Sequence, residues 1–172
     1  SGHQVGIAGS FWAAARANRV LGRNAAAISY LDSCIAKAAK LKINSLVGYC
    51  NLEKGFSFLG DMQYSQAEKS FGDALRQFEA IGNLRGIGMT ANGLGGIHLR
   101  RGDRLRARKN FSRSLEIDRR IRDTFAEAED LFQLARIDAL DGNGGSALDL
   151  VRKSVEITDS LTNGVFNDRL RS

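Results

Sequence analysis

The stretch that decides the fold is residues 101–121, which read RGDRLRARKNFSRSLEIDRRI. It begins with the turn signal Gly102-Asp103, and Ala107, Phe111 and Leu115 then follow at intervals of four residues. A glycine can end one helix in the left-handed conformation, and an aspartate after it can cap the next helix. Small and apolar residues four apart mark the buried face of a helix. The stretch therefore predicts a tight turn followed by an amphipathic helix.

The same pattern recurs along the chain with a period of forty residues. An alanine occupies the same place in each unit, and small or aliphatic residues follow it at the same offsets. These alanines are Ala27, Ala67, Ala107 and Ala147. Repetition at a fixed period indicates a solenoid of like units, in which each unit buries its apolar residues against its neighbours. The function of such a chain is expected on its surface.

The repeat predicts one all-α domain over residues 1–172, built of four antiparallel helical hairpins. Each hairpin consists of an A helix, a turn that contains glycine, and a B helix. The hairpins are expected over residues 6–41, 45–81, 85–121 and 124–161. The turn glycines are Gly22, Gly60, Gly102 and Gly142. Because Gly60 lies farther before its alanine than the other three glycines do, the second turn is expected to be two residues longer.

Polar residues between the units are expected to begin the following A helices. Asn83 and Asp123 occupy equivalent places, where a side-chain oxygen can accept a hydrogen bond from a free backbone N–H group. Asn163 occupies the same place and predicts the first turns of a fifth A helix over residues 163–172. The chain begins with Ser1 and not with Met, so we expect it to be a piece of a longer protein.

Composition narrows the class of protein further. The chain is 43% hydrophobic with a formal net charge of +6, and no apolar run approaches the roughly 18 residues of a membrane span. Its two cysteines, Cys34 and Cys50, are expected to form no close pair, and their spacing suggests neither a disulfide framework nor a zinc site. We therefore expect a cytoplasmic, reduced protein without a metal or a cofactor.

Several strings resemble the signature of the tetratricopeptide repeat family. They are Asn51-Leu52, Leu94-Gly95, Gly102-Asp103, Ala107 with Phe111, and Ser114-Leu115. The resemblance extends from about Phe11 to Leu161 and is to the longer repeat of roughly forty residues seen in kinesin light chains and bacterial regulatory arrays. It implies a right-handed superhelix whose A helices line a concave wall. It further implies that this wall holds an extended peptide or a helix of a partner protein.

Projecting the helical period places one row of A-helix side chains on that wall. The row reads Trp12, Arg16, Arg19, Cys50, Asn51, Lys54, Phe58, Asn92, Leu99, Arg100, Phe132, Gln133 and Arg136. Basic groups alternate there with aromatic and amide side chains, which suits an acidic or amphipathic peptide. Two alternatives stay open, since the aromatic residues can belong to the core and the arginines can form a solvated face.

Charge density offers a rival function. Eleven basic residues lie between Arg85 and Arg122, against three acidic ones, and residues 100–122 can bind nucleic acid or another polyanion as a basic patch. Glu116 with Arg120 and Asp118 with Arg122 are expected to pair along the helix. No exposed aromatic residue for base stacking lies among these arginines, so a protein partner is favoured over nucleic acid. Self-association through the exposed end of the array is a further alternative.

Catalysis has little support in the sequence. His98 is expected to be a packed residue on the inner side of its A helix. Gly86-Ile87-Gly88 imitates a dinucleotide-binding motif without the strand that should precede it. Gly93 and Gly95 are better explained by close approach of helices. We therefore predict a noncatalytic protein-interaction module that serves as a sensor or scaffold part of a larger regulatory protein.

Overall fold

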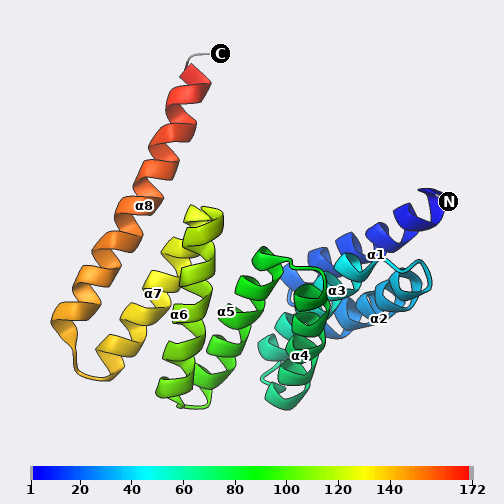
Figure 1. The fold of residues 1–172 in the computed structure, drawn as a ribbon, viewed down its shortest axis with the longest axis horizontal. Coiled ribbons are helices and arrows are strands. Elements are labelled where there is room, and N and C mark those ends of the chain that lie inside the picture. The colour runs from blue at the N-terminus through cyan, green and yellow to red at the C-terminus, as the bar shows by residue number, and fades with distance from the viewer. Residues whose placement is uncertain (1, 171–172) are drawn as a thin grey trace.

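The structure is a computed structural model that describes the backbone of residues 2–170 and the side chains of residues 2–162. Over this range the chain forms eight helices, which are α1 (Gly2–Val20), α2 (Asn24–Lys40), α3 (Asn44–Gly60), α4 (Tyr64–Ala80), α5 (Leu84–Arg100), α6 (Arg104–Ile121), α7 (Thr124–Leu140) and α8 (Gly144–Leu170). They stack in chain order as four hairpins into a curved array with the two termini at opposite ends (Figure 1). The predicted all-α solenoid is confirmed.

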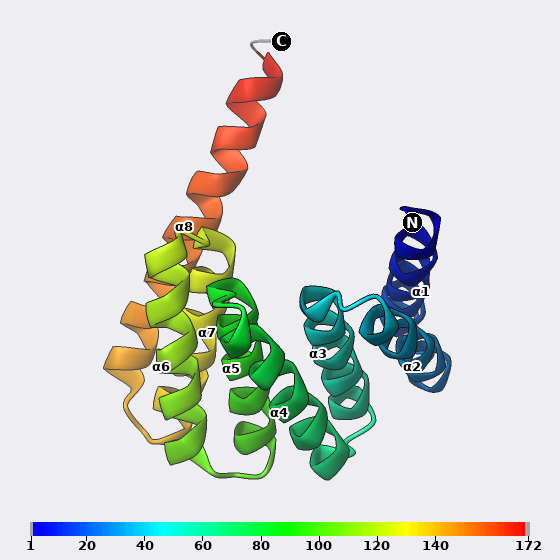
Figure 2. The same ribbon diagram turned by 45° about the vertical axis from the view of Figure 1, so that its right-hand side comes forward.

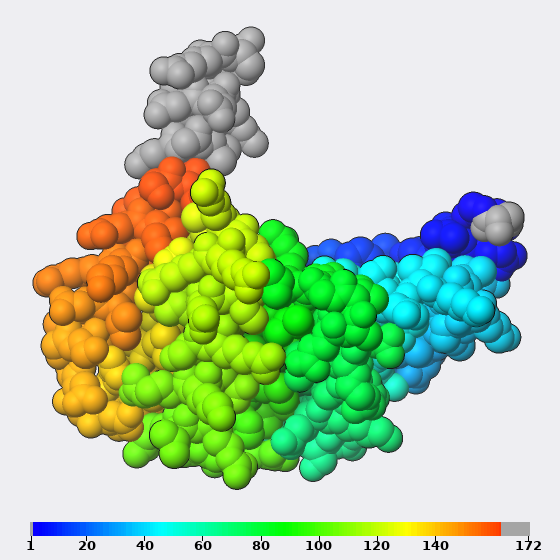
Figure 3. Space-filling model, viewed as in Figure 1, coloured from blue at the N-terminus to red at the C-terminus, as the bar shows by residue number. Residues whose placement is uncertain are grey.

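The A helices α1, α3, α5 and α7 contact one another from unit to unit, as helices on the inner side of a curved array do. Each packs against its own B helix, and α3, α5 and α7 also pack against the B helix of the preceding unit. Successive A helices touch one another, α1 with α3 and α3 with α5, whereas the contact between α5 and α7 is looser. The turned view separates the hairpins and shows their order, and the space-filling view shows the units as successive bands of colour (Figures 2 and 3). The inner wall is therefore most open between α5 and α7.

All four hairpin turns have the same length, so the prediction of a longer second turn is wrong. Helix α3 runs on through Gly60, and the turn is made by Met62, with φ of 57°. Met62 occupies the place that glycine holds in the other three turns, where Gly22, Gly102 and Gly142 have φ of 71°, 80° and 81°. The forty-residue period therefore holds in the turns as well as in the helices.

The predicted caps between units form at two of the three positions. The Asn83 side chain accepts a hydrogen bond from the Gly86 amide at 2.9 Å, and Asp123 accepts one from the Ala126 amide at 3.3 Å. Within the third hairpin, Asp103 caps α6 in the same way, accepting from the Arg106 amide at 3.0 Å. These oxygens satisfy N–H groups that the first turn of a helix leaves without a partner.

The turn predicted at Asn163 is absent, because α8 continues as one helix to Leu170. The earlier inter-unit turns place Lys42, Gly82 and Arg122 at positive φ. The equivalent residue is Thr162, and a β-branched residue strongly disfavours this conformation. Its hydroxyl instead donates to the Thr158 carbonyl oxygen at 2.6 Å, inside the helix. The side chains predicted for the fifth A helix lie outside the described residues.

Glycines in the A helices make room for phenylalanines of the B helices. Phe71 of α4 is fully buried, and a Cβ atom at Gly55 or Gly93 would lie 2.5 Å from its ring. Phe111 of α6 is placed in the same way against Gly95, where a Cβ atom would lie 2.9 Å from the ring. The interpretation of Gly93 and Gly95 as sites of close helix approach is confirmed. Each phenylalanine thus anchors adjacent helices in the core.

Cys34 of α2 and Cys50 of α3 are joined by a disulfide, with their Cα atoms 6.6 Å apart. Both are fully buried, so the expectations that they form no pair and that Cys50 faces the inner wall are wrong. The physical reason is the packing between units. The seventh residue after each repeat alanine lies on the B-helix face that meets the next A helix, and Cys34 is that residue in the first unit.

Candidate functional site

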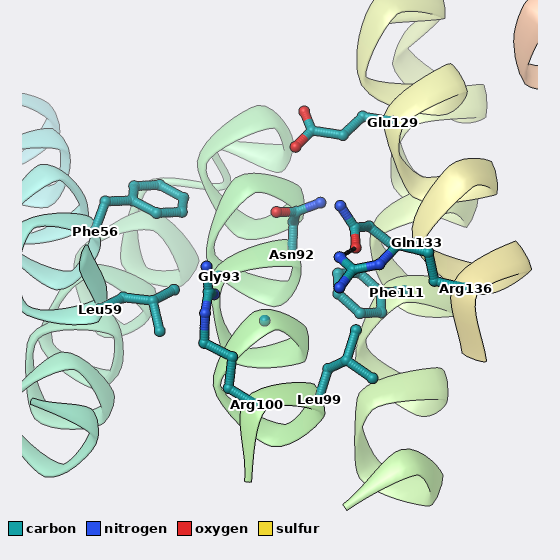
Figure 4. A pocket seen from close by; sticks show the side chains of 11 residues that line it. Phe56, Leu59, Asn92, Gly93, Leu99, Arg100, Phe111, Glu129, Gln133 and Arg136 are labelled. Atoms are coloured by element: carbon teal, nitrogen blue, oxygen red, sulfur yellow. Dashed lines mark hydrogen bonds between the residues drawn. The ribbon is translucent and has the colours of Figure 1, made fainter. Parts of the chain in front are cut away.

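Two adjoining hollows open on the inner wall where α5 and α7 separate. The first, of 240 Å³, is bordered by residues of α3, α5 and α7, chiefly Phe56, Leu59, Asn92, Arg100, Gln133 and Arg136 (Figure 4). Figure 4 shows Asn92 between Phe56 on one side and Gln133 with Arg136 on the other. Arg136 Nη1 donates to Gln133 Oε1 at 2.7 Å. In the described part of the chain, neither Arg100 nor Arg136 forms an ion pair, so both guanidinium groups remain available to an acidic group.

The second hollow, of 420 Å³, shares Phe56, Asn92 and Glu129 with the first. Asp118 of α6 lines it, and so do Arg85 and Asp123, which form an ion pair at 3.0 Å. Beside Asp118, Asp130 of α7 is fully buried. Asn92 Nδ2 donates to Asp130 Oδ1 at 2.7 Å, which ties the inner wall to this buried pair.

Burial changes the acidity of both carboxyl groups. Desolvation is the largest effect, and it raises the pKa of Asp118 to about 6 and that of Asp130 to about 7. The negative charge of Asp118 also raises the pKa of Asp130, and that of Asp123 raises the pKa of Asp118, whereas the hydrogen bond with Asp130 lowers the pKa of Asp118. Two carboxyl groups in contact, with raised pKa values, hold a proton more tightly than exposed ones do. The sequence assigned Asp118 to a surface pair with Arg122, and this assignment is wrong because Asp118 is buried.

The predicted residues of the first unit lie beside α3. They do not border the hollows themselves, but the Arg19 guanidinium lies 5.8 Å from the ring centre of Phe56, which borders both. Trp12 is half-buried against Tyr49, with ring centroids 6.4 Å apart, and the Arg16 guanidinium lies 4.9 Å above the Trp12 ring. Arg16 and Arg19 both reach Glu53, with Nε to carboxylate distances of 3.4 and 2.7 Å. Glu53 therefore neutralises much of the positive charge that the sequence predicted at this end of the wall.

Two predicted residues of the second unit, Asn51 and Lys54, contact other parts of the protein and not the hollows. Asn51 is buried and donates from Nδ2 to the Val47 carbonyl oxygen of its own helix at 3.0 Å. Lys54 Nζ lies 2.6 Å from Asp32 Oδ1, which ties α3 to α2. The structure thus brings five residues of the predicted row together at the first hollow, namely Asn92, Leu99, Arg100, Gln133 and Arg136.

Phe132 is 47% exposed and lies in a separate apolar hollow of 380 Å³ between α7 and α8, together with Ala135, Leu148 and Val151. The residues that sequence reasoning missed are Phe56, Asp118, Glu129 and Asp130. A signal for the two aspartates was present in the repeat itself. At the forty-residue period, Asp118 is equivalent to Phe78 and Asp130 to Thr90, both of which are buried.

Most arginines of the basic stretch are paired with carboxylates of neighbouring units. Arg108 lies 2.6 Å from Asp138 and 3.1 Å from Asp141, and Arg104 lies 2.6 Å from Asp141. Other pairs in the stretch are Arg101 with Glu68, Arg113 with Glu79 and Arg119 with Glu127. This arrangement leaves less free positive charge for a polyanion than the sequence count implies.

A search of the described helices for a segment of the length and hydropathy that a membrane span needs finds none.

Stacked helical hairpins with an open inner wall define the protein as an α-helical repeat solenoid. Residues 86–160 match the sequence model of the family described as tetratricopeptide repeat. The same forty-residue unit precedes that region, so the chain is similar to tetratricopeptide repeat proteins beyond the matched residues as well. Proteins of this fold generally mediate protein–protein interactions. No curated protein sequence matches the chain.

Several solved structures share the fold. BtubC (BKLC) from P. vanneervenii has a TM-score of 0.76 and 17% identity, over 90% of this chain and 64% of its own. The apo form of RapI has a TM-score of 0.81 and 16% identity, over 95% of this chain and 60% of RapI. A putative kinesin light chain from Podosopora anserina, with nearly identical TPR-like repeats, has a TM-score of 0.59 and 15% identity, over 90% and 76%. This chain therefore spans less than two thirds of the length of BtubC and of RapI.

Proposed function

We propose that the chain is a noncatalytic module that binds an extended segment of a partner protein along α3, α5 and α7. The observation that carries this proposal is the pair of adjoining hollows on the inner wall, of 240 and 420 Å³. Helical repeat arrays of this kind use their concave side for extended or helical ligands. The module serves as a sensor or scaffold part of a longer regulatory protein.

The first hollow suits an acidic group of the partner. Arg100 and Arg136 approach it from α5 and α7, and the amides of Asn92 and Gln133 line the same hollow, with Gln133 beside Arg136 (Figure 4). Guanidinium and amide N–H groups are the donors that bind a carboxylate well. Phe56 and Leu59 supply an apolar wall on the α3 side, so the hollow also holds an apolar side chain next to the acidic group.

The first unit extends the proposed surface. Trp12, Arg16 and Arg19 continue the A-helix row, although Glu53 offsets the two arginines. Asn51 and Lys54 keep structural partners and contribute less, and Phe132 serves as an apolar anchor at the far end. We propose the cytoplasm as the location of the module.

A random peptide library displayed on phage, selected on the folded chain, tests this function. The affinities of the selected peptides are then measured by fluorescence anisotropy. The double variant Arg100→Ala with Arg136→Ala is expected to bind at least about tenfold more weakly, which corresponds to about 1.4 kcal/mol. The double variant Arg120→Ala with Arg152→Ala carries the same change of charge on two B helices and should bind as the wild type does. Equal affinity for all three proteins, or enrichment of no peptide, contradicts the proposal.

A further inference from the structure

Two buried carboxylates interrupt the pattern of the repeat at the junction between the third and fourth units. Asp118 is 3% exposed and Asp130 is 0% exposed. The equivalent residues of the preceding unit are Phe78 and Thr90, and those of the unit before that are Ala38 and Cys50. The repeat therefore packs at these positions without a charged group. A buried carboxylate costs several kcal/mol unless a proton, a donor or a cation compensates it, so its presence needs a cause beyond packing.

The protein leaves this pair only partly satisfied. Asp130 Oδ1 accepts a hydrogen bond from Asn92, but Asp130 Oδ2 is buried and has no hydrogen-bond partner in the described part of the chain. Asp118 forms no ion pair there. Arg85, the cation whose charge acts on Asp118, is itself held by Asp123 at 3.0 Å. Asp118, which borders the second hollow, thus retains capacity for one more positive partner, while Asp130 contacts Asp118 from behind.

The hollow of 420 Å³ gives that partner a route to Asp118. Its walls include the apolar side chains of Phe56, Met89 and Phe125, and Glu129 adds a further negative charge at its border. Lysine and arginine have long apolar stems with a charged end, and such stems pack along apolar surfaces while the charged end reaches a polar partner. A metal ion such as Ca²⁺ needs a fuller set of oxygen ligands than two carboxylates supply. The chemistry of the walls therefore favours an organic cation.

We propose that this hollow is a subsite for an arginine or lysine side chain of the bound partner segment, with Asp118 as the direct acceptor and Asp130 behind it. The inference rests on the proposed function and refines it. A partner segment would then carry an acidic group over Arg100 and Arg136 and a basic group over Asp118. Opposite charges placed side by side fix both the direction and the register of an extended segment.

The acidity of the pair supports this assignment and adds a pH dependence. Near neutral pH the empty pair holds a proton, since burial raises the pKa of Asp118 to about 6 and that of Asp130 to about 7. A cationic side chain takes the place of that proton, so its binding strengthens as the pH rises from about 6 to about 8. The other charged groups at the site are Arg85 on α5, Asp123 ahead of α7 and Glu129 on α7.

The experiment is a titration of the whole ¹⁵N-labelled chain with N-acetyl-arginine amide, followed by amide chemical shifts. Its neutral isostere, N-acetyl-citrulline amide, is the ligand control. We expect saturable shifts around α5, α6 and α7 with an affinity on the order of millimolar, and none with the citrulline compound. Asp118→Asn, which keeps the shape and removes the charge, should weaken binding at least about fivefold. Asp149→Asn, an exposed change on α8, should leave it unaltered.

Equal shifts with the citrulline compound, or unchanged affinity in the Asp118→Asn variant, overturn the subsite. These outcomes are separable from failure of the proposed function. Peptides that lose affinity in the Arg100 and Arg136 double variant but not in Asp118→Asn support groove binding and contradict the basic subsite. Arginine amide that binds through Asp118, while the library yields no peptide, supports the subsite and contradicts the larger function.

Discussion

At the scale of single residues, Met62 shows that a turn position can be recognised by its place in the repeat better than by its residue type. Its φ is 57°, and its side chain is 70% exposed. A residue with a Cβ atom is strained in this conformation, whereas glycine is not. Met62→Gly is therefore expected to raise the free energy of unfolding by about 0.5 kcal/mol, since the gain in the turn exceeds the entropy that glycine adds to the unfolded chain. Urea denaturation measures the change.

Gly102→Ala is the matched control for this prediction, because Gly102 occupies the same turn position with φ of 80°. It should lower the free energy of unfolding by about 1 kcal/mol. A loss of stability in Met62→Gly would show that the exposed methionine side chain contributes more than its backbone strain removes.

The predicted positions of single side chains agree with the structure where helical phase decides them and disagree where burial decides them. Asn92, Arg100, Gln133 and Arg136 meet at one hollow, as their places on the A helices indicated. Asp118 was assigned to the surface because a charged residue four places before an arginine normally pairs with it. Its true surroundings come from α5 and α7, which a single helix cannot reveal.

At the scale of elements, the B-helix phenylalanines explain why glycine is tolerated in the middle of A helices. Phe71 fills the space that a Cβ atom at Gly93 would occupy, 2.5 Å from the ring. Gly93→Ala is expected to lower the free energy of unfolding by about 1–3 kcal/mol, the usual cost of overpacking a core. Gly72 of α4 is the control, because no atom lies within 4 Å of a Cβ placed there. Gly72→Ala should stabilise the chain by about 0.5–1 kcal/mol through helix propensity.

Circular dichroism during thermal and urea unfolding separates these two results. If both alanine variants stabilise the protein equally, α3, α4 and α5 are packed less tightly around Phe71 than the structure indicates.

The helices themselves were predictable from the sequence because the period and the polar caps fix their phase and their ends. The continuation of α8 past Asn163 was not predictable in this way, because a cap residue begins a new helix only where the chain before it can turn.

At the scale of the whole molecule, the curvature of the array decides which charges stay available. Carboxylates of adjacent units reach many of the arginines, as Glu53 reaches Arg16 and Arg19. Where α5 and α7 separate, Arg100 and Arg136 have no such partner in the described part of the chain. A sequence count of charges cannot separate these cases, because the pairs join residues about one unit apart. The forty-residue period predicts the scaffold, and its local interruptions indicate the site.

The buried aspartates also act on the stability of the whole molecule. Folding raises the pKa of Asp130 from 3.8 to about 7 and that of Asp118 from 3.8 to about 6, so between these values the folded chain binds more protons than the unfolded chain. Their contribution to stability is therefore largest below about pH 4 and is lost as the pH rises toward 7.

Asp130→Asn removes the Asp130 titration, and its amide oxygen can still accept a hydrogen bond from Asn92. At about pH 8 this variant should be more stable than the wild type by at least about 1 kcal/mol, and the difference should shrink or reverse at about pH 4.5. Urea unfolding at both pH values, with exposed Asp149→Asn as control, measures the difference, and a difference that does not change with pH would mean that Asp130 is ionised in the folded chain.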